Sequence, residues 1–174
     1  MQGELHSGVA VYTIDSDALM EIFSDNSPFS KTVMTGLWDR ILEQIAKERI
    51  ISHKEVHLEI KTDGIRGLEL FDWAQANKHV FKDHDWDDES AVIKLMSPRY
   101  SAFVDGDKSS AEHADPWLVA QAKCRGLTVI TQENRSNSPH IERYKIPNIC
   151  ADPLFGVDCL DLLGLIKKEG WRFK

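Results

Sequence analysis

Hydrophobic positions along this chain fall into two patterns, short apolar runs and stripes at helical spacing. The runs at 9–14 and 127–131 are rich in β-branched residues, which is typical of buried strands in a parallel sheet. Residues 50–51 and 157–160 predict two shorter strands. Apolar stripes at helical spacing predict helices near residues 18–23, 38–47, 56–60, 68–76, 91–96, 116–122 and 162–166.

Polar and glycine-rich stretches separate these elements. We expect loops at 24–30, at the acidic segment 83–89, and at 97–110 and 134–140, and a break at Gly64 and Gly67. Pro147 predicts an extended edge segment at 146–150. Gly170 is expected to end the last helix. Strands alternating with helices indicate an α/β fold with a central, mostly parallel sheet.

Three helix starts carry cap signals. Asp115 followed by Pro116 predicts an N-cap and a first helical residue. Ser52 and Glu55 match a capping box. Ser16 or Asp17 is expected to cap the helix that follows the first strand.

Length and composition are those of one globular domain, 1–174, because 42% of the residues are hydrophobic and 28% are charged. The formal net charge of −7 argues against a broadly basic nucleic-acid surface, although a local basic rim remains compatible with it. No apolar run is long enough for a membrane span and no signal peptide is recognisable, so we expect a cytoplasmic protein with no membrane partner. The odd number of cysteines, three, indicates reduced thiols rather than a disulfide framework.

Acidic residues occur where strands end and helices begin. Asp15 follows the first strand, Glu133 follows the strand at 127–131, and Asp115 opens a helix. Glu59 lies on an early helix. Ligands of open α/β sheets gather at the carboxyl ends of the strands, so these four side chains are expected to line one cleft. Clustered carboxylates repel one another, and a bound Mg²⁺ or Mn²⁺ ion usually neutralises this repulsion. Such an ion activates water near a phosphodiester.

Other candidate sites are weaker. Asp105, Gly106 and Asp107 resemble part of a calcium loop, but the closing Glu is missing. The histidines show no H-E-x-x-H spacing, and a surface position is expected for them. No phosphate-binding glycine loop or Ser/His/Asp pattern is present.

Four segments resemble the PIN-domain family. They are 12–19 (YTIDSDAL), 55–60 (EVHLEI), 114–122 (ADPWLVAQA) and 129–133 (VITQE). The closing segments 145–150 (KIPNIC) and 170–173 (GWRF) are similar to those of a PIN-like bacterial subgroup with an Ala-Asp-Pro-Trp helix start. The resemblance runs over nearly the whole chain.

This resemblance implies a three-layer α/β/α fold and a divalent-metal ribonuclease. Such proteins are often the toxin of a toxin–antitoxin pair and often homodimers. Carried over by position, Asp15, Glu59, Asp115 and Glu133 would be both the catalytic residues and the metal ligands, with Ser16 and Thr131 as supporting neighbours. The family more often has Asp than Glu at the position of Glu133.

The sequence therefore predicts an Mg²⁺- or Mn²⁺-dependent endoribonuclease with an RNA substrate, held by basic residues such as Arg135 and Lys123. Two alternatives stay open. One is a PIN-like module that binds RNA or protein without cutting. The other is a phosphatase of the haloacid-dehalogenase type, because Asp15-x-Asp17 after a strand is similar to the first motif of that family.

Overall fold

The computed structural model describes residues 9–62, 68–106 and 113–173 of the chain. Its strands are β1 (Tyr12–Ile14), β2 (Ile50–His53), β3 (Phe81–Lys82), β4 (Thr128–Ile130) and β5 (Cys159–Leu160). Its helices are α1 (Ser16–Phe23), α2 (Thr35–Ala46), α3 (Lys54–Thr62), α4 (Leu68–Ala76), α5 (Trp86–Met96), α6 (Ser101–Asp105), α7 (Asp115–Arg125), α8 (Ile146–Cys150) and α9 (Leu162–Glu169).

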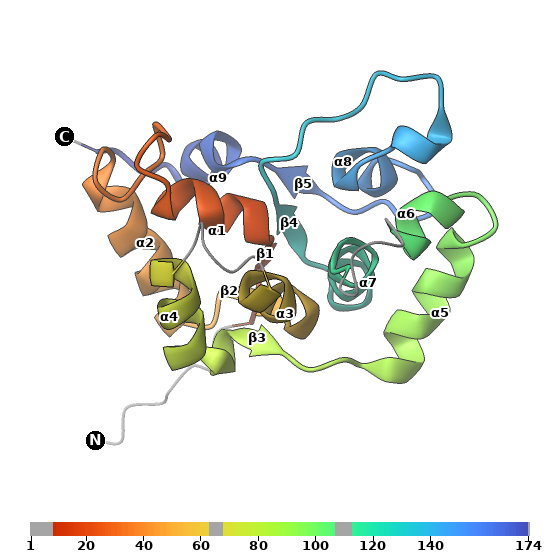
Figure 1. The fold of residues 1–174 in the computed structure, drawn as a ribbon, viewed down its shortest axis with the longest axis horizontal. Helices are drawn as coiled ribbons and strands as arrows, with labels where there is room; N and C mark the ends of the chain where they lie inside the picture. The colour runs from red at the N-terminus through yellow and green to blue at the C-terminus, as the bar shows by residue number, and fades with distance from the viewer. Residues whose placement is uncertain (1–8, 63–67, 107–112, 174) are drawn as a thin grey trace.

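The strands form one parallel sheet in the order β3-β2-β1-β4-β5. Helices cover both of its faces, with α2 and α9 on the left and α7 and α8 on the right in Figure 1. Helix α7 contacts β1, β2 and β4, and α2 contacts β2. The predicted three-layer α/β/α arrangement is therefore confirmed. Parallel strands end at the same edge of the sheet, which collects the loops before α1 and α3 and after β4.

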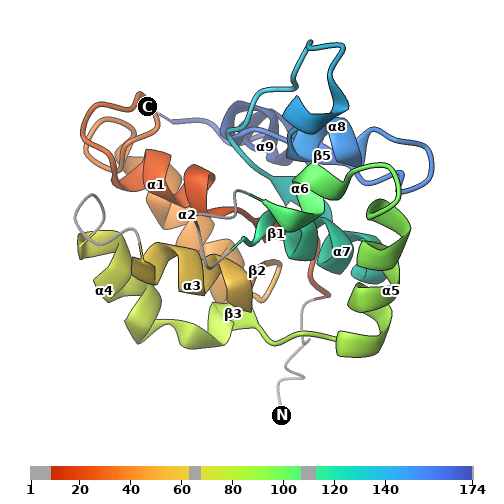
Figure 2. The ribbon, with the colours of Figure 1, turned by 45° about the vertical axis from the view of Figure 1, so that its right-hand side comes forward.

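The core lies between the sheet and these helices. The strand residues Tyr12, Ile14, Val129 and Ile130 are buried, as expected for strands covered on both faces. Gln121 on α7 is also fully buried, and its Oε1 accepts a hydrogen bond of 2.6 Å from the Thr13 hydroxyl. This hydrogen bond links α7 directly to β1. Figure 2 shows α5 packed alongside α7, outside the sheet.

Several predicted boundaries are wrong. The segment Ile146–Cys150 is helix α8 rather than an extended edge, and Pro147 lies in its first turn, where a missing N–H costs nothing. Helix α6 occupies part of the expected loop 97–110, and α5 begins at Trp86, inside the acidic segment. Strand β3 was not predicted. The break expected at Gly64 and Gly67 lies outside the described residues.

The predicted caps also differ from those observed. Asp15 itself caps α1, in place of Ser16 or Asp17. Ala114 precedes α7, so Asp115 is its first residue rather than its N-cap. Ser52 belongs to β2 and donates its hydroxyl hydrogen to the carbonyl of Ile14 at 2.6 Å, so the capping box does not form. Among the described residues, no helix has the length and apolar character needed to cross a membrane.

Candidate functional site

Asp15 is held at the carboxyl edge of the sheet, directly after β1. Its Oδ1 accepts a hydrogen bond from the Ser16 N–H (2.7 Å), and its Oδ2 accepts one from the Thr131 hydroxyl (2.9 Å). The residue is only 3% exposed. Because Thr131 follows β4, which pairs with β1, the two strand ends together fix the direction of this carboxyl group.

Asp17 lies beside Asp15 in the first turn of α1. Its Oδ1 accepts hydrogen bonds from the Thr131 hydroxyl (3.1 Å) and from the Gln132 N–H (3.0 Å). The Thr131 hydroxyl has one hydrogen and faces both carboxyl groups. Asp15 and Asp17 are therefore neighbours, and the negative charge of Asp17 acts on Asp15.

Glu59 reaches the same place from the second turn of α3. Its Oε2 accepts a hydrogen bond from the Ser16 hydroxyl (2.9 Å), and its Oε1 accepts one from the Ala114 N–H (2.8 Å). The carboxyl group of Glu59 thus connects the start of α1 with the residue before α7.

Asp115 completes this group from the first turn of α7. A carboxylate oxygen of Asp115, one of Glu59 and a ring nitrogen of His113 lie within 4.8 Å of one another. The Nε2 atom of His113 is 2.6 Å from the carbonyl oxygen of Phe103 and donates to it, so a neutral ring keeps its lone pair on Nδ1. His113 is thus a further nitrogen donor beside the carboxylates.

Glu133 lies at the rim of the cluster. Its Oε2 accepts a hydrogen bond from the Ile146 N–H (3.0 Å), at the start of α8, and its Oε1 is 3.5 Å from the Lys145 ammonium. Its charge still acts on Asp115. The structure therefore groups Asp15, Glu59 and Asp115 closely, and it directs Glu133 partly toward α8.

Burial and mutual repulsion raise the pKa values of these carboxyl groups. The pKa of Asp15 is raised well above its usual range, chiefly by burial and then by the charges of Asp17 and Asp115. The pKa of Asp115 is raised to about 7 by burial and by the charge of Glu133, against the opposing effect of His113. Burial also raises the pKa of Glu59, although the hydrogen bonds from Ala114 and Ser16 oppose this.

This set of donors fits a hard divalent cation. Carboxylate oxygens from separate elements converge, and their pKa values show that they repel one another when charged. Mg²⁺ and Mn²⁺ prefer oxygen ligands, and a bound cation removes the repulsion that otherwise favours protonated carboxyl groups.

A polar cleft of about 540 Å³ adjoins the cluster. Thr131, Glu133 and Arg135 line it, and Arg135 also lines a smaller pocket of about 200 Å³ together with Arg99 and Tyr144. Arg135 therefore lies in the cleft that adjoins the carboxylate cluster. Lys123 lies eight residues after Asp115 on α7, about 12 Å along the helix axis.

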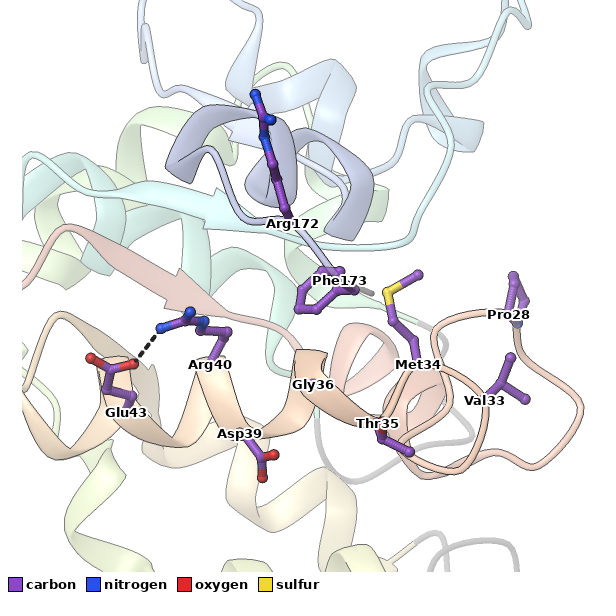
Figure 3. Close-up of a pocket in the computed structure, with 10 residues that line it drawn as sticks. All are labelled: Pro28, Val33, Met34, Thr35, Gly36, Asp39, Arg40, Glu43, Arg172 and Phe173. Atoms are coloured by element: carbon purple, nitrogen blue, oxygen red, sulfur yellow. Dashed lines mark hydrogen bonds and ion pairs between the residues drawn. The ribbon is translucent and has the colours of Figure 1, made fainter.

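A further pocket, of about 590 Å³, lies between α2 and the C-terminal segment (Figure 3). Arg40 and Glu43 form an ion pair of 3.1 Å on its α2 wall, and Phe173 lies over Gly36. None of the clustered carboxylates lines this pocket.

Two members of the site were not among the predicted ligands. Asp17 was considered as a cap, as a supporting neighbour and as the second Asp of a phosphatase-like motif, and the structure places it in the first turn of α1, beside Asp15. His113 precedes Asp115 by two residues, but its direction depends on the distant Phe103 carbonyl. Only the first of these had a local signal.

Comparison with known proteins gives one match. A family model described as "Domain of unknown function (DUF4411)" matches residues 12–173. No curated protein and no solved structure matches the chain significantly.

Proposed function

The chain belongs to the DUF4411 family, and we propose that it is a divalent-metal-dependent endoribonuclease. The observation that supports this most is the meeting of Asp15, directly after β1, with Glu59 on α3 and Asp115 on α7 at one edge of the sheet. Three buried or half-buried carboxyl groups destabilise a fold unless they are protonated or hold a cation, so their convergence favours a functional role.

Asp15 and Asp115 would hold Mg²⁺ or Mn²⁺ most directly, with Glu59 completing the site. When bound, such an ion lowers the pKa of a water molecule and stabilises the negative charge that builds up on a phosphodiester. The Oε1 atom of Glu133 also faces Lys145, and displacement of this exposed ammonium would free that oxygen to orient water.

Neighbouring groups preorganise these carboxylates. The Thr131 hydroxyl and the Ser16 N–H fix the two oxygens of Asp15, while the Ser16 hydroxyl and the Ala114 N–H fix those of Glu59. Ligands held in this way need little rearrangement when a cation binds.

RNA is the proposed substrate. The PIN resemblance supports this choice, and Arg135 supplies a local positive charge in the cleft beside Thr131 and Glu133. A guanidinium group suits phosphate through paired N–H donors. A role as the toxin of a toxin–antitoxin pair, with homodimer formation and inhibition by a partner protein, is part of the same proposal.

The test compares RNA cleavage in Mn²⁺ by the wild-type protein, Asp15→Asn, Asp115→Asn and the control Asp39→Asn. Asp39 is exposed on α2, away from the cluster. We expect the two cluster variants to lose at least about a hundredfold in rate, since each removes a charged ligand, and the control to keep full activity. Equal cleavage by all four proteins would refute the proposal.

Two further readouts separate the alternatives. Hydrolysis of a phosphomonoester that depends on Asp15, without RNA cleavage, would support the phosphatase instead. RNA binding without cleavage, and with no Mn²⁺ bound in calorimetry, would support the non-catalytic module.

A further inference from the structure

A second cluster of ionisable side chains lies at the carboxyl ends of β2 and β3, apart from the carboxylate cluster. His53 ends β2, His84 follows β3, and Glu89 lies in the first part of α5. One ligand atom from each lies within 4.8 Å of the others. His53 was expected at the surface, but its side chain and that of Glu89 are 0% exposed, and that of His84 is 5% exposed.

Two atoms of this cluster are buried without a hydrogen-bond partner among the described residues. They are Nδ1 of His84 and Oε1 of Glu89. A buried polar atom without a partner destabilises the fold, and more strongly when the group is charged. The hydrogen-bonding capacity of such buried atoms is usually satisfied by a bound ligand, an ion or a proton.

The tautomer of His84 leaves its lone pair directed into the cluster. Its Nε2 is 2.7 Å from Oε1 of Glu55, which fixes a proton on Nε2. In a neutral ring, Nδ1 then carries the lone pair, 3.7 Å from Oε2 of Glu89. A carboxylate that holds the outer N–H of a histidine, while the inner nitrogen faces a ligand position, is the usual support of a metal-binding histidine.

The distances between the ligand atoms also suit a small ion with tetrahedral coordination. Bonds of about 2.0–2.1 Å at tetrahedral angles separate neighbouring ligand atoms by about 3.3–3.4 Å. Oε2 of Glu89 is 3.1 Å from Nε2 of His53 and 3.7 Å from Nδ1 of His84, so the observed separations bracket this value.

We propose that His53, His84 and Glu89 form a binding site for a Zn²⁺-like transition-metal ion, independent of the carboxylate site. Two imidazoles and one carboxylate are ligands that zinc and its neighbours prefer, whereas Mg²⁺ and Ca²⁺ prefer oxygen alone. The fourth position is left to water. The ion would tie β2, the segment after β3 and α5 together.

His53 is the ligand that has to change on binding. Its Nδ1 accepts a hydrogen bond from the Glu55 N–H (3.1 Å), so a neutral ring without metal carries its proton on Nε2 and donates it to Glu89. The ion takes the place of this proton, which moves to Nδ1 while the contact with Glu55 opens.

Aromatic rings enclose the cluster. Trp117 stacks over His53 at 6.0 Å between ring centroids, and Trp86 stacks over His84 at 4.0 Å. The two indoles also meet edge to face at 5.4 Å. Trp86 is 61% exposed, so it covers His84 from the solvent side. An apolar wall of this kind strengthens the electrostatic attraction between the ligands and the ion.

The experiment measures Zn²⁺ binding by calorimetry after treatment with a chelator, in a double variant, Asp15→Asn with Asp115→Asn, that disables the carboxylate site. We expect one equivalent of Zn²⁺ to bind and to raise the melting temperature. Adding Glu89→Gln or His84→Phe should lower the affinity at least about tenfold, whereas His79→Ala, which removes an exposed histidine, should not. Circular dichroism checks that each variant is folded.

Cobalt(II) provides a second readout on the unmutated protein. We expect a tetrahedral ligand-field spectrum without a thiolate-to-cobalt band, which excludes the free cysteines as ligands. The proposal is overturned if no Zn²⁺ binds, if binding survives both Glu89→Gln and His84→Phe, or if the cobalt spectrum shows thiolate ligands. None of these results depends on whether the protein cleaves RNA.

Discussion

The hydroxyl of Ser16 donates a hydrogen bond of 2.9 Å to Oε2 of Glu59, across 43 residues of sequence. This contact joins the first turn of α1 to the second turn of α3. The other oxygen of Glu59 accepts from the N–H of Ala114, so three segments meet at one carboxylate. Glu59 is therefore a structural link as well as a proposed ligand.

The variant Ser16→Ala tests this link. We expect the free energy of unfolding to fall by about 1–2 kcal/mol, because a typical hydrogen bond contributes about 0.5–1.5 kcal/mol and one to a charged group contributes more. Urea denaturation at pH 7 measures it. Ser101→Ala, at an exposed position on α6, is the control and should change stability by less than about 0.5 kcal/mol. Equal stability of Ser16→Ala and the wild type would show that the contact contributes nothing.

The raised pKa values of the carboxylate cluster predict an unusual pH dependence without metal. A carboxyl group whose pKa is higher in the folded state binds protons there more readily than in the unfolded chain. The contribution of such a group to stability is then greatest below its pKa in the unfolded chain, which is near 4. This contribution is lost as pH rises through the pKa in the folded state, which for Asp115 is about 7. Burial lowers the pKa of His57, so the contribution of this group to stability has the opposite pH dependence and increases as pH rises.

The clearest measurement is therefore a comparison with Asp115→Asn, by chemical denaturation in EDTA from pH 5 to pH 8. We expect the free energy of unfolding of the variant to rise by about 1–3 kcal/mol relative to that of the wild type across this range, because the variant lacks the negative charge that Asp115 acquires as pH rises. Addition of Mn²⁺ should stabilise the wild type and not the variant. A difference between the two proteins that does not change with pH would contradict the assignment of the shifted group to Asp115.

Local patterns were sufficient for much of the fold. Apolar β-branched runs located β1 and β4, helical stripes located α2, α4 and α9, and Gly170 ends α9 with a left-handed φ of +66°. The convergence of acids was predictable because the carboxyl ends of parallel strands share one edge.

Distant partners decided what the local patterns could not. Ser52 resembled a helix cap, but its hydroxyl donates a hydrogen bond to the carbonyl of Ile14 on the neighbouring strand. The segment after Lys145 is helical because Asn148 Oδ1 accepts hydrogen bonds from the N–H groups of Lys145 and Ser136. His53 and Glu89 meet only through the pairing of β2 with β3 and the packing of α5 against α7.

Thr131 is expected to be important for both folding and metal binding. Its hydroxyl faces Asp15 and Asp17 and accepts a hydrogen bond from the Glu133 N–H (3.2 Å). The variant Thr131→Val keeps the shape and removes these bonds, so we expect a loss of about 1–3 kcal/mol in stability. Its affinity for Mn²⁺ should also fall, since Asp15 loses its orienting donor.

Thr128→Val is the matched control, because Thr128 is buried on β4, the strand that Thr131 follows, and lies outside the carboxylate cluster. Calorimetry with Mn²⁺ and urea denaturation give the two readouts. If Thr131→Val lowers stability but leaves the Mn²⁺ affinity unchanged, the hydroxyl supports the fold and does not orient Asp15.

The last prediction concerns Gly36, in the first turn of α2, where the C-terminal segment crosses the helix (Figure 3). A Cβ atom at this position would lie 2.9 Å from Cδ1 of Phe173, so the ring would have to move. Alanine otherwise favours a helix over glycine by up to about 1 kcal/mol. In the wild-type background these two effects oppose each other, and we expect Gly36→Ala to change stability little.

In a Phe173→Ala background the clash is absent, so Gly36→Ala should stabilise the protein by about 0.5–1 kcal/mol. A double-mutant cycle measured by urea denaturation isolates the difference between the two backgrounds. Strictly additive effects would mean that Phe173 does not pack against α2 in solution. A positive coupling would show that the last residues of the chain hold the start of α2, at the opposite side of Figure 1 from α5.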